Sequence, residues 1–179
     1  MTKQFSLLLL LLASLLIAGC ESMSPSECKV ADWGRVGHAD GTRGGSDRRI
    51  ADYTEDCGKV GVVPNAQLYR YGWDQGIVNF CTPANGWREG LQGNFGQASA
   101  CKGQAGFNAF SRYLEAGLQV HGTQTQMQRN AQESERLQRR LEESKNDEEK
   151  KNLRNNLRHI DREQFRLRNQ LTHQQMLGP

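Results

Sequence analysis

The hydrophobic residues between positions 123 and 177 recur with the spacing of a coiled coil. In the second half of this segment, aliphatic side chains alternate at intervals of four and three residues: Leu153, Leu157, Ile160, Leu167 and Leu171, with Gln164 in the remaining position. The first half follows the same rule with Met127, Leu137 and Leu141, while Asn130 and Ser134 fill the intervening positions. Such spacing puts one apolar stripe along a helix, so each half predicts a helix that packs against a partner.

The two stripes do not continue into each other. Leu141 and Leu153 are twelve residues apart, which turns a straight helix by about 120° and puts the stripes on different faces. A hairpin that reverses at Asp147 removes the offset, because Leu141 then faces Leu153 and Asn130 faces Gln164. The two amides can then hydrogen-bond and fix the register. The alternative is one long helix that pairs with a second protomer.

The pattern from residue 28 to 122 is different, because glycines interrupt short apolar stretches. One helix is predicted from Trp33, capped by Asp32, and another from an Asp47 cap to Gly58. Two further helices are predicted from apolar stripes at helical spacing. Their members are Leu68, Tyr71, Gln75 and Val78, and then Phe107, Phe110, Tyr113, Leu114 and Leu118. The expected fold is mainly α, with a small disulfide-stapled helical domain followed by a coiled-coil helical hairpin.

Glycine and tryptophan recur together in this domain. Gly72-Trp73 leads to Phe80, and Gly86-Trp87 leads to Phe95. The spacing of three further glycines, Gly37, Gly41 and Gly44, repeats that of Gly86, Gly90 and Gly93. Each glycine inside a helix costs about 1 kcal/mol relative to alanine, but it allows another backbone to approach closely. We therefore expect short helices packed through glycine, with Trp33, Trp73 and Trp87 filling the space around them. The alternative is that Trp73 and Trp87 line a groove and stack on sugar rings.

The N-terminal residues have the features of a bacterial export signal. Lys3 precedes an apolar run that is too short to span a membrane as a mature helix. The run ends in Ile17-Ala18-Gly19-Cys20, which resembles a lipobox. We expect cleavage before Cys20, acylation of that residue and anchoring by its acyl chains. Glu21 favours the outer membrane, because in such lipoproteins Asp at this position favours retention in the inner membrane. The alternative is an ordinary secretory signal with an incidental cysteine.

This division predicts four segments. They are a signal peptide at 1–19, a lipid anchor and tether at 20–27, a compact domain at 28–122 and a hairpin at 123–177. The exported domain holds an even number of further cysteines, Cys28, Cys57, Cys81 and Cys101, which predicts two disulfides. Three pairings remain open, and we favour Cys28–Cys57 and Cys81–Cys101 because each closes a short loop. Zinc is disfavoured, since no Cys-x2-Cys pair exists and the compartment is oxidising.

Charge and motifs point away from several functions. The net charge of +3 gives no reason to expect nucleic-acid binding. Arginines recur every four residues at Arg154, Arg158, Arg162 and Arg166, which indicates either a solvated face or a basic stripe for acidic partners. No nucleophile elbow, phosphate-binding loop or zinc-protease motif is present. His38 and Asp40, with Asp47 nearby, form only a weak metal-binding pattern. We expect no catalytic residues, no metal and no cofactor.

The compact domain resembles an uncharacterised family of bacterial lipoproteins that is defined by a domain of unknown function. The first part of the resemblance is Asp32-Trp33, then Gly37, Asp40, Gly41 and Gly44, then Cys57. The second part is Tyr69, Gly72, Gly76-Ile77, the run Phe80-Cys81-Thr82-Pro83-Ala84-Asn85-Gly86, then Gly90, Gly93 and Cys101. The resemblance implies an exported, anchored domain, often with a helical tail, and no established activity. Phe80 and Trp87 depart from the family pattern, in which tyrosine is expected at both positions.

These observations favour a non-enzymatic lipoprotein on the periplasmic face of the outer membrane. We expect an interaction or scaffold role, in which the coiled coil binds another envelope protein or a second copy of the chain. The alternative function is peptidoglycan or glycan binding through Trp73 and Trp87.

Overall fold

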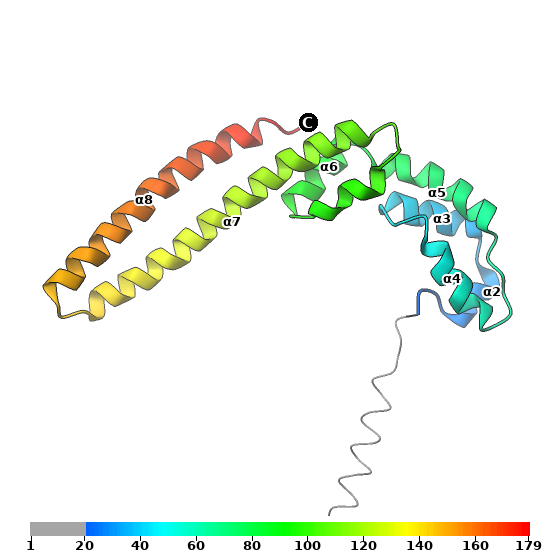
Figure 1. Ribbon diagram of the computed structural model, residues 1–179, viewed down its shortest axis with the longest axis horizontal. Helices are drawn as coiled ribbons and strands as arrows, with labels where there is room; N and C mark the ends of the chain where they lie inside the picture. The colour runs from blue at the N-terminus through cyan, green and yellow to red at the C-terminus, as the bar shows by residue number, and fades with distance from the viewer. Residues whose placement is uncertain (1–20) are drawn as a thin grey trace, which may run out of the picture. The chain divides into compact units, whose positions relative to one another are not determined.

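The computed structural model describes residues 21–179, and these residues contain helices and no β-strand (Figure 1). The helices are α2 (Pro25–Val30), α3 (Trp33–Thr42), α4 (Arg49–Gly58), α5 (Ala66–Phe80), α6 (Pro83–Leu91), the 3-10 helix η1 (Phe95–Cys101), α7 (Phe107–Glu143) and α8 (Asp147–Gln175). The expected fold class, mainly α with a disulfide-stapled domain and a hairpin, is confirmed. The predicted signal peptide and Cys20 lie outside the described residues.

The described chain divides into two compact units. The first unit comprises residues 21–41 and 45–76, and the second comprises residues 42–44 and 77–179. The predicted boundary between residues 122 and 123 falls inside α7, which continues across it without a break. Each unit contains one of the two favoured disulfides, Cys28–Cys57 in the first and Cys81–Cys101 in the second.

In the first unit, α3 and α5 cross at contacts between glycine and backbone. A Cβ atom at Gly37 would overlap the carbonyl oxygen of Tyr69, and one at Gly72 would overlap that of Gly34. The Cys28–Cys57 disulfide, with a Cα–Cα distance of 5.4 Å, joins α2 to α4. Aromatic rings pack around this contact, with Trp33, Tyr53, Tyr69 and Trp73 all buried. We call the contact between α3 and α5 the first crossing.

Two sequence predictions in the first unit are wrong in detail. Asp47 does not cap α4, because the helix begins at Arg49 and Asp47 instead pairs with Arg70. The predicted stripe of Leu68, Tyr71 and Val78 does not face the core: these side chains are exposed, whereas Tyr69, Trp73, Ile77 and Phe80 are buried. The positions of Gly72 and Gly76 explain this outcome, since the packed face of α5 is the face on which glycine permits close approach.

In the second unit, α6 crosses α7 in the same manner. Cβ atoms at Gly86 and Gly90 would overlap the carbonyl oxygens of Phe110 and Leu114, and Gly117 lies opposite Gly90. The Phe80 and Phe110 rings pack 5.4 Å apart between centroids. We call the contact between α6 and α7 the second crossing. The expectation that short helices pack through glycine therefore agrees with both crossings.

Helices α7 and α8 form the hairpin. The connecting residues 144–146 lie between them, and the Asn146 side chain caps α8 by accepting the Glu149 N–H at 3.0 Å. The seam contains Leu137, Leu153 and Ile160, with Leu141 and Leu157 packed against them. Figure 1 shows α8 running back along α7, so the stripes meet within one chain rather than in one long helix.

The predicted hydrogen bond between Asn130 and Gln164 is absent. Gln164 Nε2 donates to the Met127 carbonyl at 2.9 Å, and Asn130 Oδ1 accepts from Gln126 at 2.9 Å. Gln164 reaches the carbonyl three residues before Asn130, so the two amides do not meet directly. Asn130 Nδ2 and Gln164 Oε1 are consequently buried without a hydrogen-bond partner among the described residues.

Candidate functional site

The outward side of α8 carries basic side chains and one exposed aromatic ring. At 3.6 residues per turn, Lys151, Arg154, Arg158, Arg162 and Phe165 share one face, roughly opposite the seam. All five are exposed, and the Phe165 side chain keeps 66% of its surface accessible. We call these residues the α8 outer face. An exposed phenylalanine among arginines is the composition that protein interfaces favour, because aromatic and arginine side chains are enriched there.

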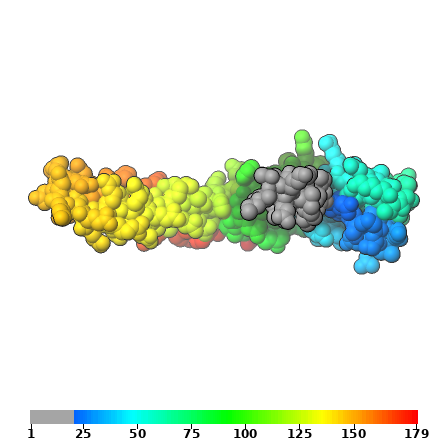
Figure 2. Space-filling model, turned by 90° about the horizontal axis from the view of Figure 1, so that it is seen from below, coloured from blue at the N-terminus to red at the C-terminus, as the bar shows by residue number. Residues whose placement is uncertain are grey.

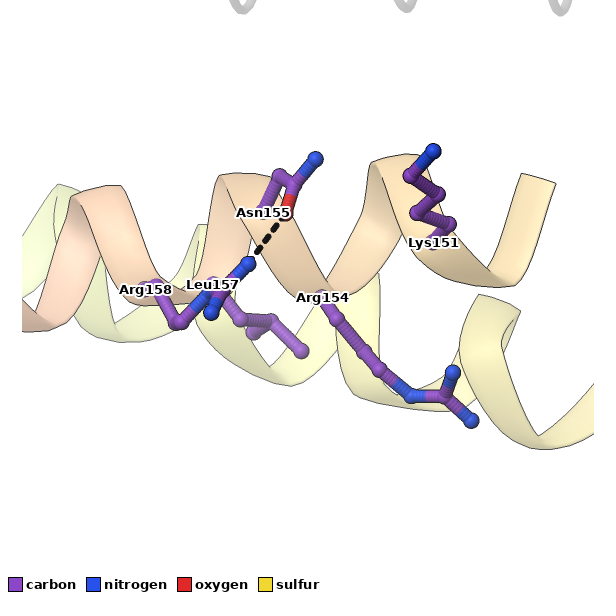
Figure 3. A pocket seen from close by; sticks show the side chains of 5 residues that line it. All are labelled: Lys151, Arg154, Asn155, Leu157 and Arg158. Carbon is purple, nitrogen blue, oxygen red and sulfur yellow. Dashed lines mark hydrogen bonds between the residues drawn. The ribbon is translucent and has the colours of Figure 1, made fainter. Parts of the chain in front are cut away.

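A shallow groove marks one end of this face (Figure 3). It is lined by Lys151, Arg154, Asn155, Leu157 and Arg158. Figure 3 shows Leu157 between the side chains of Arg154 and Arg158, and Arg158 donates a hydrogen bond to the side-chain oxygen Oδ1 of Asn155. Leu157 is half-buried at the edge of the seam, so the groove has an apolar floor and basic walls.

Among the described residues, three of the six arginines elsewhere in the hairpin have carboxylate partners, namely Arg136, Arg140 and Arg166. Arg136 pairs with Glu133 at 2.6 Å, and Arg140 pairs with Glu149 at 2.8 Å. The Arg136 guanidinium lowers the pKa of Glu133, and the Ser144 hydroxyl, followed by Arg140, lowers the pKa of Glu149. In these pairs, a neighbouring carboxylate neutralises the guanidinium charge that would otherwise attract acidic ligands.

The arginines of the α8 outer face are distinguished by sharing one face of the helix, since Arg129, Arg139 and Arg168 of the described hairpin also make no salt bridge. Within the part of the chain that the structure describes, Arg154, Arg158 and Arg162 make no salt bridge. Arg166 is turned toward the other side of α8, where it lies 3.8 Å from Glu163. Of the four arginines in the predicted basic stripe, Arg166 is thus the one with a carboxylate neighbour, and Phe165 shares a face with the other three.

Trp73 is poorly placed for the alternative function of sugar stacking. It is 5% exposed, its Nε1–H donates to the Gly45 carbonyl at 2.8 Å, and Arg70 lies over its ring. Trp87 is half-buried, and a Cβ atom at Gly178 would lie 3.2 Å from its indole ring. Trp87 thus lies against the end of α8.

A second groove lies beside the first crossing and was not foreseen from the sequence. Its floor contains Gly34 and Gly72, and its rim contains Leu68 and Tyr71, which are 52% and 65% exposed. The other lining residues are Asp32, Arg35, His38, Ala39 and Gln75. No local sequence pattern marks this groove, because its residues come from the α3 and α5 segments, which meet only in the folded unit.

Asp40 lies at the centre of the first unit and is 2% exposed. It accepts hydrogen bonds from Arg49, Tyr53 and Tyr69, each at 2.9 Å. Burial, followed by the hydrogen bond to Asp40, raises the pKa of Tyr69 well above its ordinary value. Asp40 is thus directed into the core while His38 is exposed, and the described residues hold no cluster of three His, Cys, Asp or Glu side chains suited to a metal ion.

Comparison with known proteins identifies one relationship. Residues 32–119 match the family model described as a protein of unknown function, DUF2799. The match begins at the cap of α3 and ends inside α7, so it includes both crossings and excludes most of the hairpin. No curated protein and no solved structure matches the chain. Among residues 21–179, no helix combines the length and the apolar character that crossing a membrane requires.

Proposed function

We propose that this chain is a non-catalytic interaction or scaffold protein of the bacterial envelope. On this proposal it is a lipoprotein anchored through Cys20 on the periplasmic face of the outer membrane, and it contacts an acidic protein partner through the hairpin. The observation that carries the proposal is the α8 outer face, where the exposed Phe165 shares one face of the helix with three arginines that make no salt bridge among the described residues.

The hairpin seam supports this choice of surface. Leu153, Ile160 and Leu167 are at most 8% exposed, because α7 covers them within the same chain. A partner therefore has to contact the outer faces of the hairpin, and self-association through the seam would require the hairpin to open. On the α8 outer face, Phe165 offers an apolar anchor, while the arginines select carboxylates and speed association with an acidic surface.

The test is site-specific photo-cross-linking in the native envelope. A photoreactive amino acid at Phe165 should capture a partner, whereas the same amino acid at His159, on another face of α8, should not. Arg154→Glu, Arg158→Glu and Arg162→Glu together should abolish capture, while Arg166→Glu should leave it unchanged. Helical content measured by circular dichroism controls for folding.

Two outcomes would contradict the proposal. Capture from Phe165 that survives the triple charge reversal would show that the arginines do not recognise the partner. Cross-links to lipid alone would identify an anionic membrane, rather than a protein, as the ligand of this face. Replacing Cys20 with serine tests the anchor separately, because the unanchored chain should leave the membrane fraction.

A further inference from the structure

The chain is fastened to α4 almost immediately after Cys20. The Ser22 N–H and the Ser22 hydroxyl both donate to Asp56 Oδ2 at 2.7 Å. Lys59 Nζ lies 2.7 Å from the other oxygen of the same carboxylate, and together these groups lower the pKa of Asp56. The predicted tether of residues 20–27 is therefore not a free spacer, since only Glu21 separates Cys20 from a fixed residue.

Two strongly exposed valines lie near this attachment. Val30 and Val63 are 82% and 83% exposed, among the highest values for large hydrophobic side chains in the described chain. Val30 follows Cys28 of the Cys28–Cys57 disulfide by two residues, and Val63 follows Val62, whose N–H donates to the Cys57 carbonyl at 3.0 Å. Figure 1 shows α2, the end of α4 and the loop after it at one end of the first unit.

Carboxylates outnumber lysines at this end, with Glu21, Glu27, Glu55 and Asp56 beside Lys29 and Lys59. The Glu27 carboxylate accepts the Ser24 N–H at 2.9 Å, and Asp56 is engaged by Lys59 and Ser22. Lys29 is exposed on α2, and Lys59 also interacts with Glu21 and Glu55. Any ligand of this end would therefore be held by the valines and by the alkyl stems of the lysines more than by net charge.

We infer that Val30 and Val63 rest in the interfacial region of the lipid bilayer, as a second membrane contact beside the acyl anchor. We call Ser22, Lys29, Val30, Lys59 and Val63 the anchor-proximal surface. Figure 2 shows the first unit in blue and cyan, as seen from below the view of Figure 1. The inference rests on the proposed lipid anchor. Two residues of extended chain span about 7 Å, so an acylated Cys20 brings Ser22, and with it this surface, to the headgroups. Lysines at such a depth extend their ammonium groups toward water while valines enter the acyl boundary.

The test measures depth in the membrane. The full chain is reconstituted in phosphatidylethanolamine vesicles with an environment-sensitive fluorescent amino acid at position 30 or 63, and bromine-labelled lipid is added as quencher. Both labels should be quenched at least about twofold, as expected for side chains buried about 5–10 Å into the interface. The matched control is the same label at Tyr71, which is 65% exposed in the same unit and should stay unquenched. Because charge is a minor contributor, quenching should persist at high salt.

Mass spectrometry of the reconstituted chain separates the two proposals. If Cys20 carries no acyl chains, the anchor proposal fails; the chain beginning at Cys20 is then coupled through that thiol to a maleimide lipid, and quenching is measured again. Quenching at positions 30 and 63 in either preparation supports the inference. Absence of quenching in an anchored preparation overturns it, as does equal quenching at position 71. Val30→Asp with Val63→Asp should abolish the insertion without displacing the acyl anchor, which would identify the valines as its cause.

Discussion

The first and second crossings place the same glycine spacing in different surroundings. Gly37 in α3 and Gly86 in α6 lie against the carbonyls of Tyr69 and Phe110, respectively. Both short helices end two residues before a glycine with positive φ, Gly44 at 73° and Gly93 at 81°. A side chain at these glycines would be strained, so glycine ends both helices in the same way.

The difference lies in what surrounds the glycines. In the first crossing, the Tyr69 hydroxyl bonds to the buried Asp40, whereas Phe110 in the second crossing has no hydroxyl and packs against Phe80. Glu89, which follows Gly86 by three residues as Asp40 follows Gly37, is only half-buried and accepts from Asn94. The comparison teaches that glycine fixes the helix contact, while the surrounding core can be polar or apolar.

The largest effect should come from filling the crossings. Gly37→Leu and Gly86→Leu should each destabilise the protein by about 4 kcal/mol or more, because even a Cβ atom overlaps backbone at both sites. Gly122→Ala is the matched control: a Cβ there meets nothing within 4 Å, so helix propensity should raise stability by about 0.5–1 kcal/mol. Urea denaturation measures all three. If either leucine variant is tolerated, the two crossings are not equivalent.

The two disulfides should contribute almost equally to the free energy of unfolding. Replacing Cys28 and Cys57, or Cys81 and Cys101, by serine should each cost about 3–4 kcal/mol, because loops of 29 and 20 residues differ little in closure entropy. Thermal unfolding of the two double variants compares them directly. A gap between them larger than about 2 kcal/mol would mean that the units differ in how much they depend on their cross-link.

Asp40 should distinguish the crossings. Asp40→Asn removes the charge that Arg49, Tyr53 and Tyr69 share, and should cost about 2–3 kcal/mol. Glu89→Gln, at the corresponding position of the second crossing, should cost less than about 0.5 kcal/mol because surface polar changes have small effects. Chemical denaturation of both variants checks this difference. Equal costs would show that the buried carboxylate is not what separates the two cores.

Alkaline pH should weaken only the first crossing. The pKa of the Tyr69 hydroxyl is higher in the folded protein than in the unfolded chain, where it is about 10. The contribution of this hydroxyl to folding stability is therefore complete below about pH 10 and decreases as the pH rises further. By pH 11 the loss should be about 1 kcal/mol relative to Tyr69→Phe, which cannot titrate. Stability measured between pH 8 and pH 11 in both proteins gives the difference. Parallel curves would contradict the assignment to Tyr69.

The smallest change concerns the hairpin that extends the second crossing. Asn130→Leu together with Gln164→Leu removes two buried polar atoms without partners and should raise stability by about 1 kcal/mol. Leucine at these positions also weakens the register preference, so engineered cysteine pairs at 137 and 157 should cross-link less selectively within the chain. Loss of stability would indicate that the two amides are satisfied through water.

The sequence predicted the elements governed by strong local patterns. The 4-3 spacing of leucines and its mirror about Asp147 led to the hairpin, and short loops between cysteines indicated the disulfide pairs. The sequence pattern predicted the wrong packed face for α5, because Leu68 and Tyr71 are as hydrophobic as the buried Tyr69. Which of these side chains is buried depends on the contact between α3 and α5. The repeated spacing of Gly37, Gly41 and Gly44 at Gly86, Gly90 and Gly93 was visible in the sequence, and Gly37 and Gly86 occupy corresponding places in the two crossings.

The candidate site was only partly foreseeable. The arginine spacing is visible in the sequence, but whether Arg154 or Arg166 has a carboxylate partner depends on helical phase and rotamer. Phe165 was missed because a single phenylalanine outside the heptad stripe carries no periodic signal. The groove beside Gly34 and Gly72 was missed for a related reason, since its residues come from two helices that meet only in the folded unit.

The contact between Gly178 and Trp87 has a practical consequence for anyone who purifies this protein. A tag fused after Pro179 would begin next to the Trp87 indole and would disturb the packing of the chain end after α8 against this ring. A tag before Cys20 would be removed with the predicted signal peptide. Residues 144–146 connect the two arms in an exposed turn remote in sequence from both ends. An epitope inserted there should leave the crossings, the α8 outer face and Cys20 available for experiments.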